Sequence, residues 1–340
     1  MPLHHYLPAT FLASFSLDSS TVPRRKRHLY VGDKQEDRIF HTSAANTGAI
    51  QNLYTLVATG DDPDVIDRTW AEYEAKLSEA ITLLIAGEVD ARTWVRVLVP
   101  FVACMLVRCP DFDKRFERRI SALGIDTEAG HVSKDNTNHA RLLELQRLLG
   151  PVVVAKWVVL RVKGEEPLIT NDLGYAPFVN RATREAGIAI PLSLSHALAV
   201  IPRNEGRIAV GQSGKWVPDI EHVDNLPDNH EGLNRALSST AQRFIFGSDD
   251  ETVRKWLQCS SASSFAPEPE QLGFIAGTLA LAHEFTWHRL AVALERDPSD
   301  GAPWDFPLDW ERLAQGWTPR CSSPVTSWNF PQRFTARDVP

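Results

Sequence analysis

Helical and strand patterns occupy separate stretches of this chain, and that segregation constrains its fold more than any other feature. Residues 61–150 place apolar side chains at spacings of three and four, which predicts a helical part. Residues 151–225 contain short β-branched runs, which predicts a mostly antiparallel sheet. Residues 228–295 return to helical spacing. Because runs of helices and strands that do not alternate are typical of α+β proteins, we expect an α+β fold.

Capping and turn residues predict where individual elements begin and end. The pattern from Leu29 to Ser43 reads as two short strands around a turn, so we expect an N-terminal β-hairpin packed with a helical bundle. Gly150-Pro151 is typical of a helix stop, so strands are expected from Val152–Val154 onward, with a further one at residues 207–210. The predicted helices run from Asp62-Pro63 to Gly87, from Asp90 to Cys109, from Pro110 onward, from about Asn138 to Leu149, from Asp228 to Phe244, from about Thr252 to Gln258, and over residues 271–294.

The length and composition favour one large core. The chain has 340 residues, of which 43% are hydrophobic, so we expect a single α+β domain over residues 1–297. Residues 298–340 alternate tryptophan with proline, which predicts an irregular C-terminal tail packed on the body by aromatic anchors. Because tryptophan is favoured at interfaces, this tail is also a candidate site for a protein partner. Its anchors are Trp304, Trp310, Trp317 and Trp328.

The charge balance limits the partners that the chain can bind. The 36 Lys+Arg against 43 Asp+Glu give a formal charge of −7, which argues against a protein that coats nucleic acid or anionic membrane with its whole surface. Local basic faces remain at Arg24–His28 and at Lys114–Arg119. Each either contacts phosphates or is an ordinary solvated face. The sequence makes no prediction about the oligomeric state.

Cysteine usage and hydropathy favour a cytoplasmic protein that does not enter a membrane. The four cysteines form no CxxC pair, which indicates neither a disulfide framework nor a zinc ribbon. The basic run at Arg24–His28 follows the apolar stretch around Phe11-Leu12, the reverse of a signal peptide. The longest uncharged apolar run, Val97 to Val107, has about half of the roughly 20 residues that a membrane-spanning helix needs.

Common catalytic motifs are absent from the sequence. It contains no GxxxxGK[ST], no GxGxxG and no GxSxG, so the nucleotide-binding and α/β-hydrolase classes lose their best support. His283 and His288 resemble the histidines of a zinc-protease helix, but their spacing of five places them about 140° apart. We expect structural histidines there, with a metal-dependent hydrolase as an alternative. The sequence leaves open whether the chain requires a metal or a cofactor.

Several short motifs occur in the order of a known family. His4-His5-Tyr6-Leu7-Pro8, with Phe11-Leu12 and Phe15 behind it, resembles the HHYxPxxxLxxF signature of the domain of unknown function 4238 family. The resemblance covers residues 4–246. The sequence departs from the family pattern at Asn171, where serine is usual, and at Leu173-Gly174, where asparagine-proline is usual. The further matches are Leu29–Lys34, Ala44–Asn46 with Leu53-Tyr54, Arg108–Pro110, Trp157 with Leu168–Asp172, Ile190–Ser193, and Asn234 with Ala241, Arg243 and Phe244.

The resemblance implies candidate positions but no reaction, because the activity of the family is unassigned. His5 can exchange a proton near neutral pH, and Tyr6 can donate a hydrogen bond, which suits acid/base catalysis. Asp172 directly follows an apolar strand, where rigid scaffolds present catalytic groups. We therefore take His5, Tyr6 and Asp172 as candidate catalytic residues. The candidate substrate-binding residues are His4, Arg108, Asn171, Asn234 and Arg243.

The same residues also have structural interpretations. His5 and Tyr6 can bond backbone groups and fasten the N-terminus, and Asn-Asp-Leu-Gly at Asp172 is ordinary turn chemistry. A buried Arg108 needs a partner, which is either a carboxylate such as Asp172 or a bound anion. Asn234 and Arg243 are nine residues apart on one predicted helix, so both face one pocket only if that helix bends.

Two functional hypotheses follow. The first is a nuclease-like hydrolase of phosphodiesters, such as a toxin or defence effector, acting on nucleic acid or a nucleotide at a local basic cleft. In it His5 is the general acid/base, Arg108 stabilises phosphoryl charge, and Asp172 orients the histidine or binds a divalent ion. The alternative is a non-enzymatic ligand-sensing or protein-interaction module in which these residues are structural.

Overall fold

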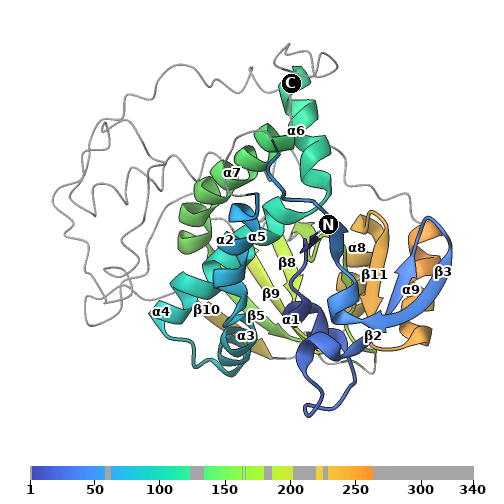
Figure 1. Cartoon of the computed structure of the whole chain (residues 1–340). Coiled ribbons are helices and arrows are strands. Elements are labelled where there is room, and N and C mark those ends of the chain that lie inside the picture. Colours follow the sequence, from blue (N-terminus) through green and yellow to red (C-terminus); the bar gives the residue numbers. More distant parts are fainter. Residues whose placement is uncertain are drawn as a thin grey trace, which may run out of the picture.

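The computed structural model confirms the α+β architecture (Figure 1). It describes residues 2–57, 63–122, 134–162, 164, 166–179, 186–201, 220–224 and 229–262. The helices are α1 (Ala9–Leu12), α2 (Val65–Glu74), α3 (Leu77–Ala86), α4 (Ala91–Thr93), α5 (Val99–Arg108), α6 (Asp111–Ala122), α7 (Lys134–Val154), α8 (Asn229–Thr240) and α9 (Asp250–Ala262). The shorter helical turns are η1 (Ala13–Phe15), η2 (Arg24–Lys26), η3 (Ala44–Asn46) and the π-helical η4 (Trp94–Leu98).

The described strands form three sheets. A five-stranded sheet has the order β10-β5-β9-β8-β7, a four-stranded sheet has the order β3-β2-β11-β6, and β1 pairs with β4. Pairing is antiparallel except between β10 and β5. The strands are β1 (Leu3–His5), β2 (His28–Asp33), β3 (Arg38–Ser43), β4 (Ala49–Gln51), β5 (Lys156–Arg161), β6 (Thr170–Asn171), β7 (Ala176–Val179), β8 (Ala186–Pro191), β9 (His196–Ile201), β10 (Ile220–Asp224) and β11 (Phe244–Gly247).

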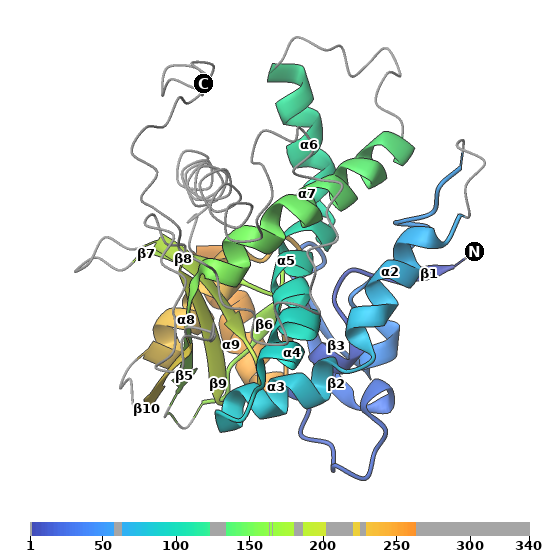
Figure 2. The same cartoon turned by 90° about the vertical axis from the view of Figure 1, so that its left-hand side faces the viewer.

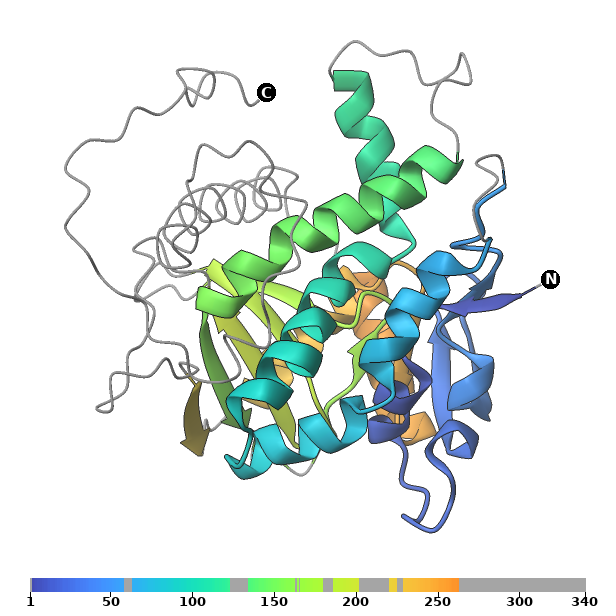
Figure 3. The ribbon, with the colours of Figure 1, turned by 60° about the vertical axis from the view of Figure 1, so that its left-hand side comes forward.

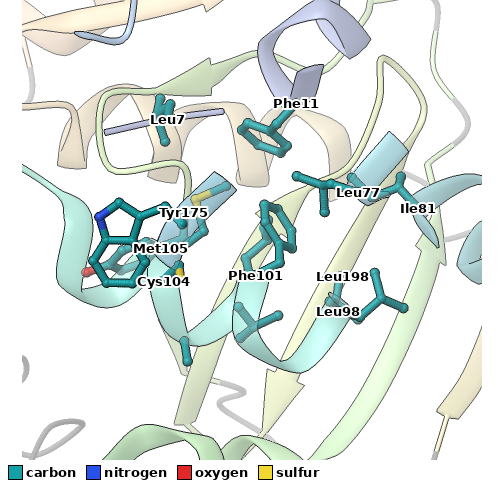
Figure 4. Close-up of a cluster of buried hydrophobic side chains, with 14 of the residues drawn as sticks. Leu7, Phe11, Leu77, Ile81, Leu98, Phe101, Cys104, Met105, Tyr175 and Leu198 are labelled. Carbon is teal, nitrogen blue, oxygen red and sulfur yellow. The ribbon is translucent and has the colours of Figure 1, made fainter. Parts of the chain in front are cut away.

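The main core lies between the five-stranded sheet and the helices that cross one of its faces. Figures 2 and 3 show α5 and α7 lying across these strands. The indole of Trp94, before α5, lies 5.4 Å from that of Trp157 on β5, and both are fully buried. In Figure 4, Phe101 of α5 lies between Phe11 of α1 and Leu198 of β9. The N-terminal segment from Tyr6 to Phe15 thus contributes to the core.

The four-stranded sheet joins the predicted hairpin to a strand that the sequence pattern assigns to a helix. The helix expected up to Phe244 ends at Thr240, and β11 follows at Phe244 and pairs with β2. This correction places Asn234 on α8 and Arg243 outside it. Helix α9 packs closely on the sheet because Gly32 has no Cβ: an added Cβ would lie 2.9 Å from a Val253 methyl carbon.

One helix continues through the predicted stop at Gly150-Pro151. Helix α7 runs to Val154, so the strand expected at Val152–Val154 is wrong. Val152 and Val153 are buried, and the Val152 carbonyl accepts a hydrogen bond from Trp157 Nε1 (3.0 Å). Burying two valines contributes about 1.5–3 kcal/mol each. That gain offsets the roughly 3 kcal/mol that a proline costs inside a helix.

The long helix predicted from Asp62-Pro63 to Gly87 is two helices, α2 and α3. Both contact η4, but α2 also lies against α5 while α3 also lies against α1. Gly87 ends α3 with a φ of 74°, as its glycine predicts. The next helical stretch begins at the expected cap, where the Asp90 side chain accepts from the Thr93 amide (2.6 Å).

Four predictions fall outside the described residues. These are the strand at residues 207–210, the helix over residues 271–294, the role of His283 and His288, and the Trp/Pro-rich tail at 298–340 with its protein partner. The division into a domain over residues 1–297 and a tail therefore stays a prediction. In the part of the chain that the structure describes, none of the helices has both the length and the apolar character required to cross a bilayer.

Candidate functional site

The N-terminal signature begins on strand β1, where His4 is a buried structural residue. The His4 Nδ1 accepts a hydrogen bond from the Tyr54 amide (2.8 Å), and the two rings stack with centroids 5.5 Å apart. An accepting Nδ1 requires the tautomer with its proton on Nε2. Burial lowers the pKa of His4, so the ring is neutral at pH 7. His4 thus fastens β1 to the segment that precedes α2.

His5 lies half-buried on the same strand. Its Nε2 is 3.1 Å from the Ala45 carbonyl oxygen, which can only accept, so the ring proton sits on Nε2 and Nδ1 carries the lone pair. Burial lowers the pKa of His5, and this outweighs the effect of the Ala45 bond and of nearby Glu74. A neutral imidazole with one fixed tautomer suits a general base.

Arg108 is buried at the end of α5 and pairs with Glu74, not with Asp172. Its Nη1 donates to the Glu74 carboxylate (2.5 Å), and its Nη2 donates to the His5 carbonyl oxygen. The guanidinium lies over the Trp70 ring, with its carbon 5.3 Å from the ring centroid. Of the two alternatives that the sequence left open, a carboxylate partner is present, and it is Glu74. Asp172, which the sequence offered as an example of such a carboxylate, instead accepts backbone N–H bonds.

Asp172 holds the turn that leads into β11. Its carboxylate accepts three backbone N–H bonds, from Gln242 (2.9 Å), Arg243 (2.6 Å) and Phe244 (3.0 Å). Burial raises the pKa of Asp172, and the three N–H donors offset part of that rise. This arrangement explains why Ala241–Phe244 leaves the helical path.

Asn171 and Asn234 are also committed to backbone groups. The Asn171 amide nitrogen donates to the carbonyls of Tyr175 (3.2 Å) and Leu237 (2.9 Å), and its oxygen accepts from the Gly174 amide (2.9 Å). Asn234 accepts from the Ile169 amide and donates to the Pro167 carbonyl, each at 3.0 Å. Both side chains are fully buried and join α8 to β6 and to the residues that precede β6.

Arg243, the last of the candidate substrate-binding residues, lies at the four-stranded sheet, directly before β11. Its guanidinium donates from Nε and Nη2 to the Asp33 carboxylate at 2.9–3.2 Å. The pair joins β11 to the end of β2. Arg243 therefore does not face a pocket shared with Asn234.

A pocket lies between the N-terminal segment, α2 and α5. Its enclosed space is about 10 Å³, room for a group of about the size of a water molecule. Most of its wall is apolar, and Figure 4 shows Leu77, Phe101, Cys104 and Met105 grouped at this place. The lining residues are Tyr6, Pro8, Trp70, Tyr73, Glu74, Leu77, Phe101, Cys104, Met105 and Arg108.

Polar groups of the pocket wall favour hydrogen bonding over nucleophilic chemistry. Within the described part of the chain, neither Trp70 Nε1–H nor Arg108 Nε–H has an acceptor, although both atoms are buried. Burial raises the pKa of the Cys104 thiol to about 12 and that of the Tyr6 hydroxyl well above 10, so both stay protonated. The described residues contain no group of three or more His, Cys, Asp or Glu side chains that could hold a metal ion.

Sequence reasoning missed Trp70 and Glu74 as parts of the pocket. Both lie on the apolar stripe of α2, four residues apart and therefore on one face. A carboxylate on a stripe that faces the core is the signal that could have found Glu74, because a buried Arg108 requires such a partner.

Comparison with known proteins gives a family and nothing more specific. A family model described as "Protein of unknown function (DUF4238)" matches residues 3–251, which agrees with the ordered motifs of the sequence. No curated protein and no solved structure matches the chain.

Proposed function

The chain belongs to the family of unknown function DUF4238, and from that premise we propose that it is a non-enzymatic ligand-binding module that senses a small molecule in the pocket. In this proposal the residues of the family motifs hold the fold around the pocket. The observation that carries it is that two residues lining the pocket, Trp70 and Arg108, each have a buried N–H donor without an acceptor among the described residues.

The hydrogen bonds of the motif residues support a structural role for most of them. Hydrogen bonds to backbone groups engage the polar side-chain atoms of Asp172, Asn171 and Asn234. A side chain engaged in this way has few donors or acceptors left for a substrate. Arg108 is neutralised by Glu74, so the pocket has little net attraction for a phosphodiester.

The pocket chemistry indicates the kind of ligand. Buried donors without acceptors each cost about 1–3 kcal/mol, and a ligand oxygen that accepts from them removes that cost. The apolar wall suits an aliphatic or aromatic body. The enclosed space is about 10 Å³, room for a group of about the size of a water molecule, so only the polar end of a ligand enters it. A small molecule with a neutral carbonyl oxygen meets these requirements, because the Arg108–Glu74 pair leaves little net charge to attract an anion.

A binding experiment tests this proposal directly. Native mass spectrometry of the purified chain, and thermal shifts with acetamide, isobutyramide, benzamide and phenylacetamide, should reveal a bound small molecule. Trp70→Phe should weaken its binding by about 2- to 12-fold, as expected for the loss of one hydrogen bond of about 0.5–1.5 kcal/mol. Trp256→Phe, a matched change in a separate buried cluster, should leave binding unchanged. No bound mass and no thermal shift would refute the proposal.

A second candidate is the hydrolase, and the geometry of His5 favours it. His5 keeps a ring nitrogen with a lone pair, and Arg25 lies near enough to lower the pKa of His5 further. A neutral base beside a cation suits a nucleic acid or nucleotide substrate. Incubation of wild type and His5→Ala with labelled DNA and RNA tests it. Equal rates, or no cleavage by wild type, would rule out His5 as the catalytic base.

The cysteines support a cytoplasmic location as part of the proposal. Cys104, Cys109 and Cys259, the cysteines that the structure describes, form no disulfide with one another. Cysteines without disulfides are typical of reducing compartments. Localisation of a fluorescent fusion tests this point.

A further inference from the structure

A rigid basic turn precedes the hairpin. Helix η2 holds Arg24, Arg25 and Lys26, and Arg27 follows it directly. The Arg27 amide bonds the Arg24 carbonyl (3.0 Å), and the Arg27 carbonyl accepts from the Ala44 amide (2.8 Å). The sequence left open whether this run is a flexible loop, but these bonds fix its backbone against η3. Four consecutive cations are therefore held in one place.

Acidic side chains do not neutralise this turn. Arg24 donates to the Ser14 hydroxyl and Arg27 to the Val22 carbonyl, both uncharged acceptors. Across the described ranges, none of the four cations forms an ion pair, and Arg25 and Lys26 are exposed. Arg27 acts on Arg24 and lowers its pKa, after the effect of burial, which shows that the charges repel one another. A fixed cluster of like charges favours an anionic partner.

Three aromatic or imidazole rings on the hairpin lie next to the basic turn, beginning at His28, the residue that follows Arg27. His28 stacks on His41 with centroids 5.0 Å apart and planes 22° apart, and Tyr30 lies 4.7 Å from His41. His28 and His41 are exposed, and Tyr30 is half-buried. Figure 1 shows β2 and β3 at the outer side of the four-stranded sheet. Asp18 is the acid that contacts this surface, at 3.4 Å from His28 Nδ1.

We propose that the basic turn (residues 24–27) and the ring platform (His28, Tyr30 and His41) form a binding surface for single-stranded nucleic acid. Cations follow the phosphates while flat aromatic rings stack with the bases, which is the combination that single-strand binding requires. The competing partner is an anionic bilayer, because Leu17 is exposed in the loop before the turn. A single leucine offers little apolar area for insertion, whereas the platform has three rings. The surface is separate from the pocket, so this proposal does not depend on the ligand-binding function.

Salt dependence tests the role of the turn. Anisotropy of a labelled 12-nucleotide dT strand, with the full chain at 50–200 mM salt, should give a slope of log K against log salt of about −3 if four phosphates are neutralised. Arg25→Gln with Lys26→Gln should halve that slope and weaken binding tenfold or more at 50 mM salt, roughly as two lost contacts predict. The matched control is Arg235→Gln with Arg254→Gln, which removes the same charge from exposed ion pairs on α8 and α9.

Two comparisons separate bases from charge alone. The double variant Tyr30→Leu with His41→Leu should bind the dT strand about tenfold more weakly, because stacking contributes about 1–3 kcal/mol per base. The same variant should bind inorganic polyphosphate as wild type does, and its circular dichroism and melting temperature report whether it folds. Three results would each overturn the proposal. The wild type does not bind dT at 50 mM salt, or Arg235→Gln with Arg254→Gln loses as much affinity as Arg25→Gln with Lys26→Gln, or Tyr30→Leu with His41→Leu binds dT as wild type does. Binding to phosphatidylserine vesicles without binding to dT would assign the surface to membranes instead.

Discussion

Replacing Asp172 by alanine decides whether the strand-end acid fastens the fold. The change removes the acceptor of three backbone N–H groups, at Gln242, Arg243 and Phe244. Hydrogen bonds to a charged group contribute about 1.5–3 kcal/mol each. Two effects reduce this loss. Removing the buried carboxylate also removes the cost of its desolvation, and water can reach the exposed Gln242 and replace part of its hydrogen bond. We therefore expect a net loss of about 3–5 kcal/mol, which is at the upper end of single substitutions.

Urea denaturation at pH 7, followed by tryptophan fluorescence, measures this loss. Asp172→Asn keeps one acceptor oxygen and should lose about 1–3 kcal/mol. Glu231→Ala, which removes an exposed acid of an i,i+4 pair, should change the free energy of unfolding by about 0.5 kcal/mol or less. A loss below about 1 kcal/mol for Asp172→Ala, with an unchanged m value, would refute the structural role and return Asp172 to the catalytic candidates.

Three further changes follow from the same contacts. Glu74→Gln leaves Arg108 buried without a counter-charge, and urea denaturation should show a free energy of unfolding lower by about 2–4 kcal/mol. This loss is smaller than that expected for a fully buried ion pair, because the Glu74 side chain is 27% exposed. Burial lowers the pKa of His4 below 6.5, so near this pH the folded chain binds fewer protons than the unfolded chain. Urea titrations should therefore show a contribution of His4 to the free energy of unfolding that is complete above pH 6.5 and is lost as the pH falls toward the folded pKa. The His4→Asn variant should have a flatter profile of stability against pH. Gly32→Ala forces a Cβ to 2.9 Å from a methyl group of α9 and should cost about 1–3 kcal/mol in thermal melts, whereas Gly232→Ala, which meets nothing within 4 Å, should be neutral or stabilising.

Local patterns predicted those parts of the fold that depend on nearby residues. The hairpin at β2 and β3, the cap at Asp90 and the helix end at Gly87 each follow from a few adjacent side chains. The errors arose where distant contacts decide. Helix α7 continues past Gly150-Pro151 because its last turn is buried. The path after Thr240 changes because Asp172, about 70 residues away, binds its amides.

The candidate site shows the same division. The motif residues were found by resemblance, and burial of Arg108 correctly demanded a partner. Its partner Glu74 lies on another helix, and only the packing of α2 on α5 brings the two together. The pocket likewise combines three segments that the sequence does not connect. A charge pattern within one segment cannot indicate which distant segment completes it.

The motif contacts span long separations along the chain, and this limits how the residues can act. His4 reaches 50 residues to Tyr54, Asn171 reaches 66 residues to Leu237, and Asp172 reaches 72 residues to Phe244. Each such bond closes a long loop, so its loss destabilises the whole domain and lowers any activity indirectly. A loss of function at these positions therefore does not identify a catalytic group. His5 differs because one ring nitrogen is not committed to the backbone, so a His5 variant that folds normally separates the hydrolase from the ligand-binding module.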